Sequence, residues 1–162
     1  MRTKKQIERR LRGVEGFRGC FSSDGVKSLP TLRTGQSYLV HELTDPDQGL
    51  GHWIGVKMSP EGDILYFDSR GFKPYGRVKR SLSAQVKQRN THILWTSSRV
   101  QSIFSDKCGE FAVMFVVLVT GGRDSFREFL NLFRTSEPAA NDMVVTDFVK
   151  LWNEKRGEGK SE

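Results

Sequence analysis

The chain has 162 residues, of which 36% are apolar, and it contains eleven Phe and three Trp. This length and composition fit one globular domain with its own core and exclude a disordered chain. The two cysteines and three histidines show no metal-ligand spacing, so we expect no zinc site. The formal net charge of +7 favours polyanionic partners such as nucleic acid.

The ends and the apolar runs of the chain bear on its location. The N-terminus is basic and no apolar segment follows it, so we expect no secretory signal there. The apolar run from Phe111 to Val119 is well short of the ~20 residues that cross a bilayer. We therefore expect an intracellular protein that is not secreted, does not insert in a membrane and keeps its cysteines reduced.

Hydrophobic spacing predicts several helices and strands along the chain. Helices are expected at residues 3–14, 78–88, 107–120, 126–133 and 142–152. Strands are expected at residues 39–40, 53–58, 64–68 and 92–96. This order predicts an α+β fold with a small mixed sheet packed against helices. We assign residues 1–154 to a single domain and residues 155–162 to a polar, disordered tail.

The segment from Lys107 to Thr120 is apolar on all sides, which is typical of a central buried helix. Ser105 or Asp106 is the expected N-cap, and the glycine pair at 121–122 is the expected stop. Cys108 then lies in the first turn. The positive end of the helix favours the thiolate form of a cysteine at that place.

His52 directly precedes one predicted strand and Asp68 ends the next one, and a turn joins the two strands. A three-residue loop in which Met58 faces Gly62, or a five-residue loop in which Lys57 faces Asp63, would set His52 directly opposite Asp68 on the same face of the sheet. An even loop without a bulge would place the two side chains on opposite faces. In the favourable register the carboxylate orients the imidazole and stabilises its protonated form. Asp63 is a weaker candidate for the acid because it lies at the turn.

Together these residues form the parts of a cysteine hydrolase. Cys108 would be the nucleophile, His52 its base and Asp68 the orienting acid, and the side-chain amide of Gln101 would donate to the oxyanion. Gly109 would let a substrate approach closely. Each residue alone also fits an ordinary structural role, and Trp53 could wall the cleft beside the His52 ring or serve in the core. Their joint occurrence favours the catalytic interpretation.

Four segments resemble the adenovirus-type maturation proteases, the adenain family, and more distantly the proteases specific for SUMO and other ubiquitin-like proteins. These segments are Gly51-His52-Trp53, Tyr66–Phe72, the block of Gln101-Ser102 with Cys108–Phe111 and Met114-Phe115, and Phe17–Phe21 followed by Asp24. The resemblance implies the same four catalytic roles. It also implies a monomeric cysteine endopeptidase, encoded by a virus or a virus-like element, that matures capsid and core precursor proteins, often after Gly. The resemblance also implies that the protein is located in the host nucleus, in the virion or in both.

The resemblance also bears on activators and alternatives. No cofactor is required for the chemistry, but adenovirus proteases are activated by DNA and by a disulfide-linked viral peptide. No cysteine lies between Arg89 and Trp95, where the peptide-linking cysteine would be expected. DNA would bind the basic helix through Arg77, Lys79, Arg80, Lys87 and Arg89. The alternatives are a ubiquitin-like-protein deconjugase, whose branch also has Asp as the acid, and a catalytically dead nucleic-acid-binding protein.

Overall fold

The structure is a computed structural model that describes residues 3–23, 29–45, 50–103 and 105–157. The described residues form one mixed sheet and five helices. The strands are β1 (Phe17–Ser22), β2 (Ser37–Asp45), β3 (Leu50–Met58), β4 (Ile64–Phe67) and β5 (Ile93–Trp95). The helices are α1 (Lys4–Leu11), α2 (Gly76–Arg89), α3 (Cys108–Leu118), α4 (Arg123–Leu130) and α5 (Pro138–Lys155). The α+β prediction is confirmed.

The five strands lie side by side in chain order. β2, β3 and β4 pair antiparallel, while β1 and β5 pair in parallel with β2 and β4 at the two edges. The sequence analysis missed β1. Its ladder with β2 is irregular between Phe17 and Cys20, and Gly19 has a positive φ of 111°. Such a short, interrupted edge strand lacks a regular two-residue repeat.

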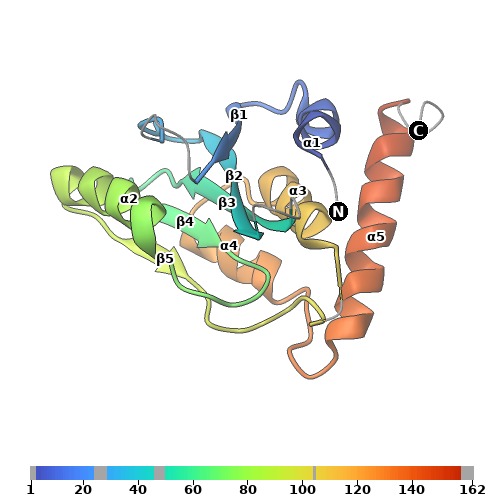
Figure 1. The fold of residues 1–162 in the computed structure, drawn as a ribbon. Helices are drawn as coiled ribbons and strands as arrows, with labels where there is room; N and C mark the ends of the chain where they lie inside the picture. Colours follow the sequence, from blue (N-terminus) through green and yellow to red (C-terminus); the bar gives the residue numbers. More distant parts are fainter. Residues whose placement is uncertain (1–2, 24–28, 46–49, 104, 158–162) are drawn as a thin grey trace.

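Helices cover both faces of the sheet, with α2 on one face and α3 on the other (Figure 1). Residues of β3 alternate between these faces: Ile54 packs in the cluster beneath α2, whereas Trp53 packs in the cluster around α3. Gly55 lets α3 come close to the sheet, since a Cβ there would lie 2.4 Å from Cδ1 of Phe115. The central helix is therefore held directly against β3.

The helix α3 is buried from Cys108 to Val116, as its composition predicts. Its ends differ from the expectation. Lys107 is the N-cap, and Ser105 instead accepts a hydrogen bond from the Lys107 backbone N–H at 3.0 Å. The helix ends at Leu118 with Val119 in an extended conformation, before the glycine pair. Cys108 is thus the first helical residue.

The last helix, α5, packs against α3 and reaches back to the N-terminal segment. Trp152 Nε1 donates to the Arg10 carbonyl at 2.9 Å, and Arg156 donates to the carbonyls of Arg10 and Arg12. The helix includes Lys155, which the sequence analysis placed in the tail. Asp24 and residues 158–162 lie outside the described residues. No helix in the described part of the chain is long and apolar enough to cross a membrane.

Candidate active site

The four predicted catalytic residues come from four different segments. His52 lies in β3, Asp68 directly follows β4, Gln101 lies between β5 and α3, and Cys108 begins α3. All four are buried, with exposed fractions of 3% for His52, 2% for Asp68 and Cys108 and 0% for Gln101. Chemistry here would take place in a water-poor environment, where hydrogen bonds and charges act strongly.

His52 and Asp68 are joined by a hydrogen bond of 2.5 Å between Nε2 and Oδ1. The loop between the paired residues Met58 and Ile64 runs from 59 to 63, an odd number of residues, so the predicted shared face is confirmed. The prediction of a directly opposite pair is wrong. Continuing the register by one residue sets Asp68 opposite Ile54, two positions from His52. Such a diagonal pair remains within reach of long side chains.

The turn after β4 holds the Asp68 carboxylate in place. Its Oδ1 also accepts the Arg70 backbone N–H at 2.8 Å, and its carbonyl accepts the Gly71 N–H at 2.9 Å. Gly71 has φ +81°, and a Cβ there would lie 2.7 Å from the carbonyl oxygen of Ser97. Only glycine suits this turn without strain, so the acid is fixed by backbone geometry.

The pKa of the His52 imidazole is set by its burial and by two neighbouring side chains. Burial lowers the pKa of His52, but the hydrogen bond with Asp68, the polar interaction with Cys108 and the charges of both outweigh burial and raise it to about 9. A ring that donates from Nε2 to Asp68 presents Nδ1 to the remaining neighbour. Nδ1 is buried and makes no hydrogen bond within the described structure, and Cys108 is the second residue that raises the pKa of this ring.

The side-chain amide of Gln101 is held at both ends. Its Oε1 accepts from Ser69 Oγ at 2.6 Å, and its Nε2 donates to the Ser105 carbonyl at 2.9 Å. An amide nitrogen carries two hydrogens, so one remains for an oxyanion. The Ser69 carbonyl also accepts the backbone N–H groups of Val100 and Gln101, each at 3.0 Å. Sequence reasoning missed Ser69, although its place next to Asp68 was a signal.

Trp53 and Gly109 both lie in the core near Cys108. Trp53 is 2% exposed and stacks on His41, with ring centroids 4.4 Å apart. Because adjacent residues of a strand point to opposite faces, Trp53 packs on the α3 side of β3. The observed stacking partner is therefore His41, not the predicted His52 ring. Gly109 is buried in the first turn of α3.

A second carboxyl group faces the site. Glu42 on β2 pairs with His52 across the ladder, is 6% exposed and accepts the Tyr75 hydroxyl at 2.7 Å. Burial raises the pKa of Glu42, the Tyr75 hydrogen bond lowers it, and the negative charge of Asp68 raises it again. Sequence reasoning missed Glu42 because the predicted strand at residues 39–40 stopped short of it. Within the described ranges, no group of three or more His, Cys, Asp or Glu side chains could hold a metal ion.

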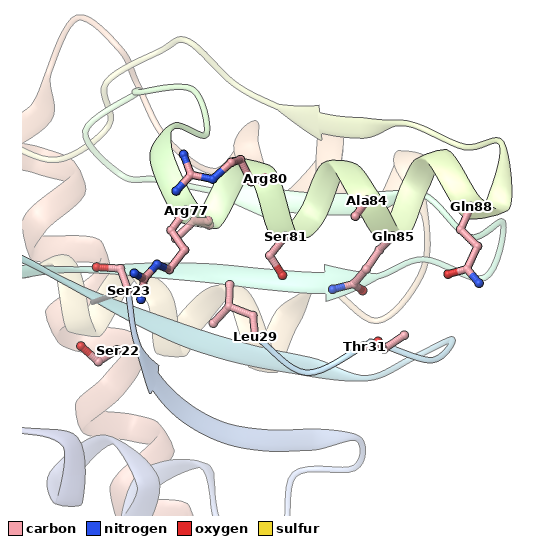
Figure 2. Close-up of a pocket in the computed structure, with 11 residues that line it drawn as sticks. Ser22, Ser23, Leu29, Thr31, Arg77, Arg80, Ser81, Ala84, Gln85 and Gln88 are labelled. Carbon is pink, nitrogen blue, oxygen red and sulfur yellow. The ribbon is translucent and has the colours of Figure 1, made fainter. Parts of the chain in front are cut away.

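The five predicted nucleic-acid contacts all lie exposed on α2. Arg77, Arg80 and Lys87 are spaced by three and seven residues and so share one side of the helix. Arg89 donates to the Leu32 carbonyl at 2.8 Å and thereby anchors the segment before β2. Arg77 and Arg80 line a cavity of about 510 Å³ against residues that follow β1 (Figure 2). The exposed basic surface on one side of α2 therefore consists of Arg77, Arg80 and Lys87, fewer than the five residues predicted.

Comparison with known proteins finds likeness in structure only. No protein-family model matches the chain, and no curated protein matches it. The crystal structure of the ASFV pS273R protease has a TM-score of 0.53 and 18% identity, covering 83% of this chain and 61% of that chain. A Se-Met crystal structure of that protease covers 63% of this chain and 40% of that chain, with a TM-score of 0.47 and 24% identity. This chain therefore spans less than two thirds of that protease, with which it shares a fold.

Proposed function

We propose that the chain is a cysteine endopeptidase. Cys108 is the nucleophile, His52 the general base and Asp68 the group that orients the imidazole. The observation that supports this most strongly is the 2.5 Å hydrogen bond between buried His52 and Asp68, together with the influence of Cys108 on the same imidazole. The shared fold with the ASFV pS273R protease supports the same class of enzyme.

The proposed reaction has two half-cycles, and in each of them His52 first accepts a proton and then returns it. His52 Nδ1 takes the thiol proton, and the Cys108 sulfur attacks the substrate carbonyl carbon. The backbone N–H of Cys108 and the free hydrogen of Gln101 Nε2 stabilise the tetrahedral oxyanion. His52 then gives its proton to the leaving amine, and a thioester remains. Water adds to the thioester while His52 accepts its proton; the carboxylic acid product leaves and the thiol is restored.

The substrate class follows from the sequence resemblance rather than from the site. We propose that the enzyme is a viral protease that cleaves capsid or core precursor proteins after glycine, as a monomer, in the host nucleus or the virion. Trp53 and Gly109 would border the scissile bond. DNA would stimulate the enzyme by binding Arg77, Arg80 and Lys87 on α2, whose exposed cations suit a phosphate backbone.

The first test is the alkylation of Cys108 by iodoacetamide at mildly acidic pH, read by mass spectrometry in the wild type and in His52→Ala. We expect labelling in the wild type and a loss of at least about ten-fold in the variant, because imidazolium stabilises the thiolate. Cys20 is the internal control: burial, followed by the charge of Glu8, raises the pKa of Cys20 to about 12. Equally slow labelling of both cysteines in both proteins would contradict the proposed role of His52.

A second test separates the two protease classes. A peptide that ends in glycine with an electrophilic warhead, and a ubiquitin-like protein with the same warhead after its Gly-Gly terminus, are each incubated with the enzyme with and without DNA. Faster modification of Cys108 by the peptide supports the maturation protease. Preference for the ubiquitin-like protein would instead assign the enzyme to deconjugation.

A further inference from the structure

A cavity of about 470 Å³ opens at the far end of α3 from Cys108. The turn after α1, the loop before β2, the end of β3 and the last turn of α3 surround it. Its lining combines Val14, Glu15, Gly16, Thr34, Gly35, Gln36, Lys57, Val116, Val117 and Thr120. Lys57 follows His52 by five residues along β3, a separation of roughly 17 Å at about 3.3 Å per residue. The cavity is therefore distinct from the catalytic site.

The backbone around this cavity is built with little freedom. Gly16 has φ +79°, and a Cβ there would lie 2.3 Å from the Gly35 carbonyl oxygen. Gly16 also accepts the Ser37 N–H at 3.0 Å, and Gly35 donates to the Met58 carbonyl at 3.0 Å. These contacts tie the two loops to each other and to the sheet.

Lys57 is the unusual member of the lining. The residue is only 6% exposed, and no ion pair or hydrogen bond engages its ammonium group in the described part of the chain. Burial alone lowers the pKa of Lys57, and no nearby charge offsets that effect. The ammonium nitrogen of Lys57 is not among the fully buried polar atoms that lack a partner, so it opens to the cavity with only part of its hydration. An anion in the cavity would compensate for the hydration that this group has lost.

Neutral donors and apolar walls complete the surroundings. The Gln36 Oε1 accepts from the Arg33 backbone N–H at 2.9 Å and from Arg18 at 3.3 Å, while its Nε2 makes no hydrogen bond within the described structure. The hydroxyls of Thr34 and Thr120 line the same space, as do three valines. Glu15, at the exposed rim, disfavours a second negative charge on a ligand.

We propose that this cavity is a binding site for a singly charged carboxylate attached to an apolar group, with Lys57 as its cation and Gln36 Nε2 as a neutral donor. One unpaired ammonium group matches one carboxylate, whereas a doubly charged phosphate would face Glu15 with only one cation to balance it. The valines bind the apolar part of the ligand. Two sources carry this chemistry: a free carboxylic acid and the carboxyl terminus of a peptide.

The test measures the melting temperature of the full chain with millimolar hexanoate, and with a short valine-rich peptide ending in a free carboxylate. Hexanamide and the same peptide with an amidated terminus are the matched neutral controls. A ligand that binds only the folded state raises the melting temperature. We expect both acids, or one of them, to raise it and both amides to leave it unchanged, and the arm that responds identifies the source. Equal effects of acid and amide, or none from either acid, would overturn the proposal.

Two variants assign the effect to the residue. In Lys57→Met the affinity for the responding acid should fall at least about ten-fold, whereas Lys57→Arg should retain binding through its charge. Unchanged affinity in Lys57→Met would overturn the proposal, and the comparison of acid with amide in the wild type decides even if that variant does not fold.

Discussion

The raised pKa of His52 makes the stability of the folded protein depend on pH in a calculable way. The ordinary pKa of histidine is 6.5 and the pKa of His52 in the folded state is about 9, a difference of about 2.5 pH units. At about 1.36 kcal/mol per unit, the protonated ring stabilises the folded state by about 3 kcal/mol. Below about pH 6.5 the ring is protonated in both the folded and the unfolded state, and its full contribution to the stability is present. It is lost as the pH rises from 6.5 through 9, because the unfolded state releases its proton first.

Urea unfolding of the wild type and His52→Gln at about pH 6 and about pH 10 measures this contribution. The free energy of unfolding of the wild type should fall by about 3 kcal/mol more than that of the variant over this range. Tyrosines, lysines and Cys20 titrate in both proteins, so their effects cancel. Asp68→Asn keeps the ring but removes its strongest partner, and should show a smaller fall. The same pH dependence in the wild type and His52→Gln would refute the reasoning.

Three other substitutions test separate parts of the structure. Gln101→Ala should lower kcat by about 100- to 1,000-fold with little change in KM, because the amide stabilises the transition state. Steady-state kinetics on a cleaved peptide measures both constants. A change confined to KM would contradict the role of Gln101 as an oxyanion donor. Ser69→Ala should destabilise the fold by about 1–3 kcal/mol in urea, since it leaves the buried Gln101 Oε1 without a donor, and should also slow turnover; unchanged stability and turnover would argue against this support. Gly55→Ala should lower the free energy of unfolding by about 1–3 kcal/mol, because the added methyl group clashes with Phe115. Gly121→Ala is the control and should lower it less, because the nearest neighbour of its methyl group would be 3.3 Å away. Equal losses in the two variants would contradict the close packing of α3 on β3.

The fold was predictable from the sequence wherever side chains repeat regularly. The all-apolar segment identified α3, and the parity of the hairpin loop correctly predicted that His52 and Asp68 share a face. The exact register was not predictable, because the turn sets it: Ser59 N–H donates to the Asp63 carbonyl at 2.8 Å, and Asp63 N–H donates to Ser59 Oγ at 3.0 Å. These two bonds close a five-residue loop that moves the partner of Asp68 to Ile54. Parity survives such a shift, whereas exact pairing does not.

The missed residues share a different physical cause. Glu42 reaches the site because β2 pairs with β3, and Ser69 reaches Gln101 because two loops distant in sequence share backbone hydrogen bonds. Neither relation leaves a periodic pattern in the chain, since both depend on tertiary contacts. The proposed nucleophile and base were recognisable because the chemistry proposed for them restricts the residue type. Supporting residues are recognised only when the geometry around them is known.

Burial of the catalytic side chains has a consequence for the order of events in the proposed reaction. Cys108 is 2% exposed and Gln101 is fully buried, so a peptide carbonyl has little access to either of them in this conformation. An opening step must therefore precede attack, and it will contribute to kcat if it is slower than chemistry. An activator that favours the open state would then speed alkylation of Cys108 and leave the pKa of His52 raised, because the hydrogen bond with Asp68 stays in place. An activator that instead assembles the His52–Asp68 pair would change both quantities, because this pair raises that pKa. Measuring the two together, with and without DNA, therefore distinguishes opening of the site from its assembly.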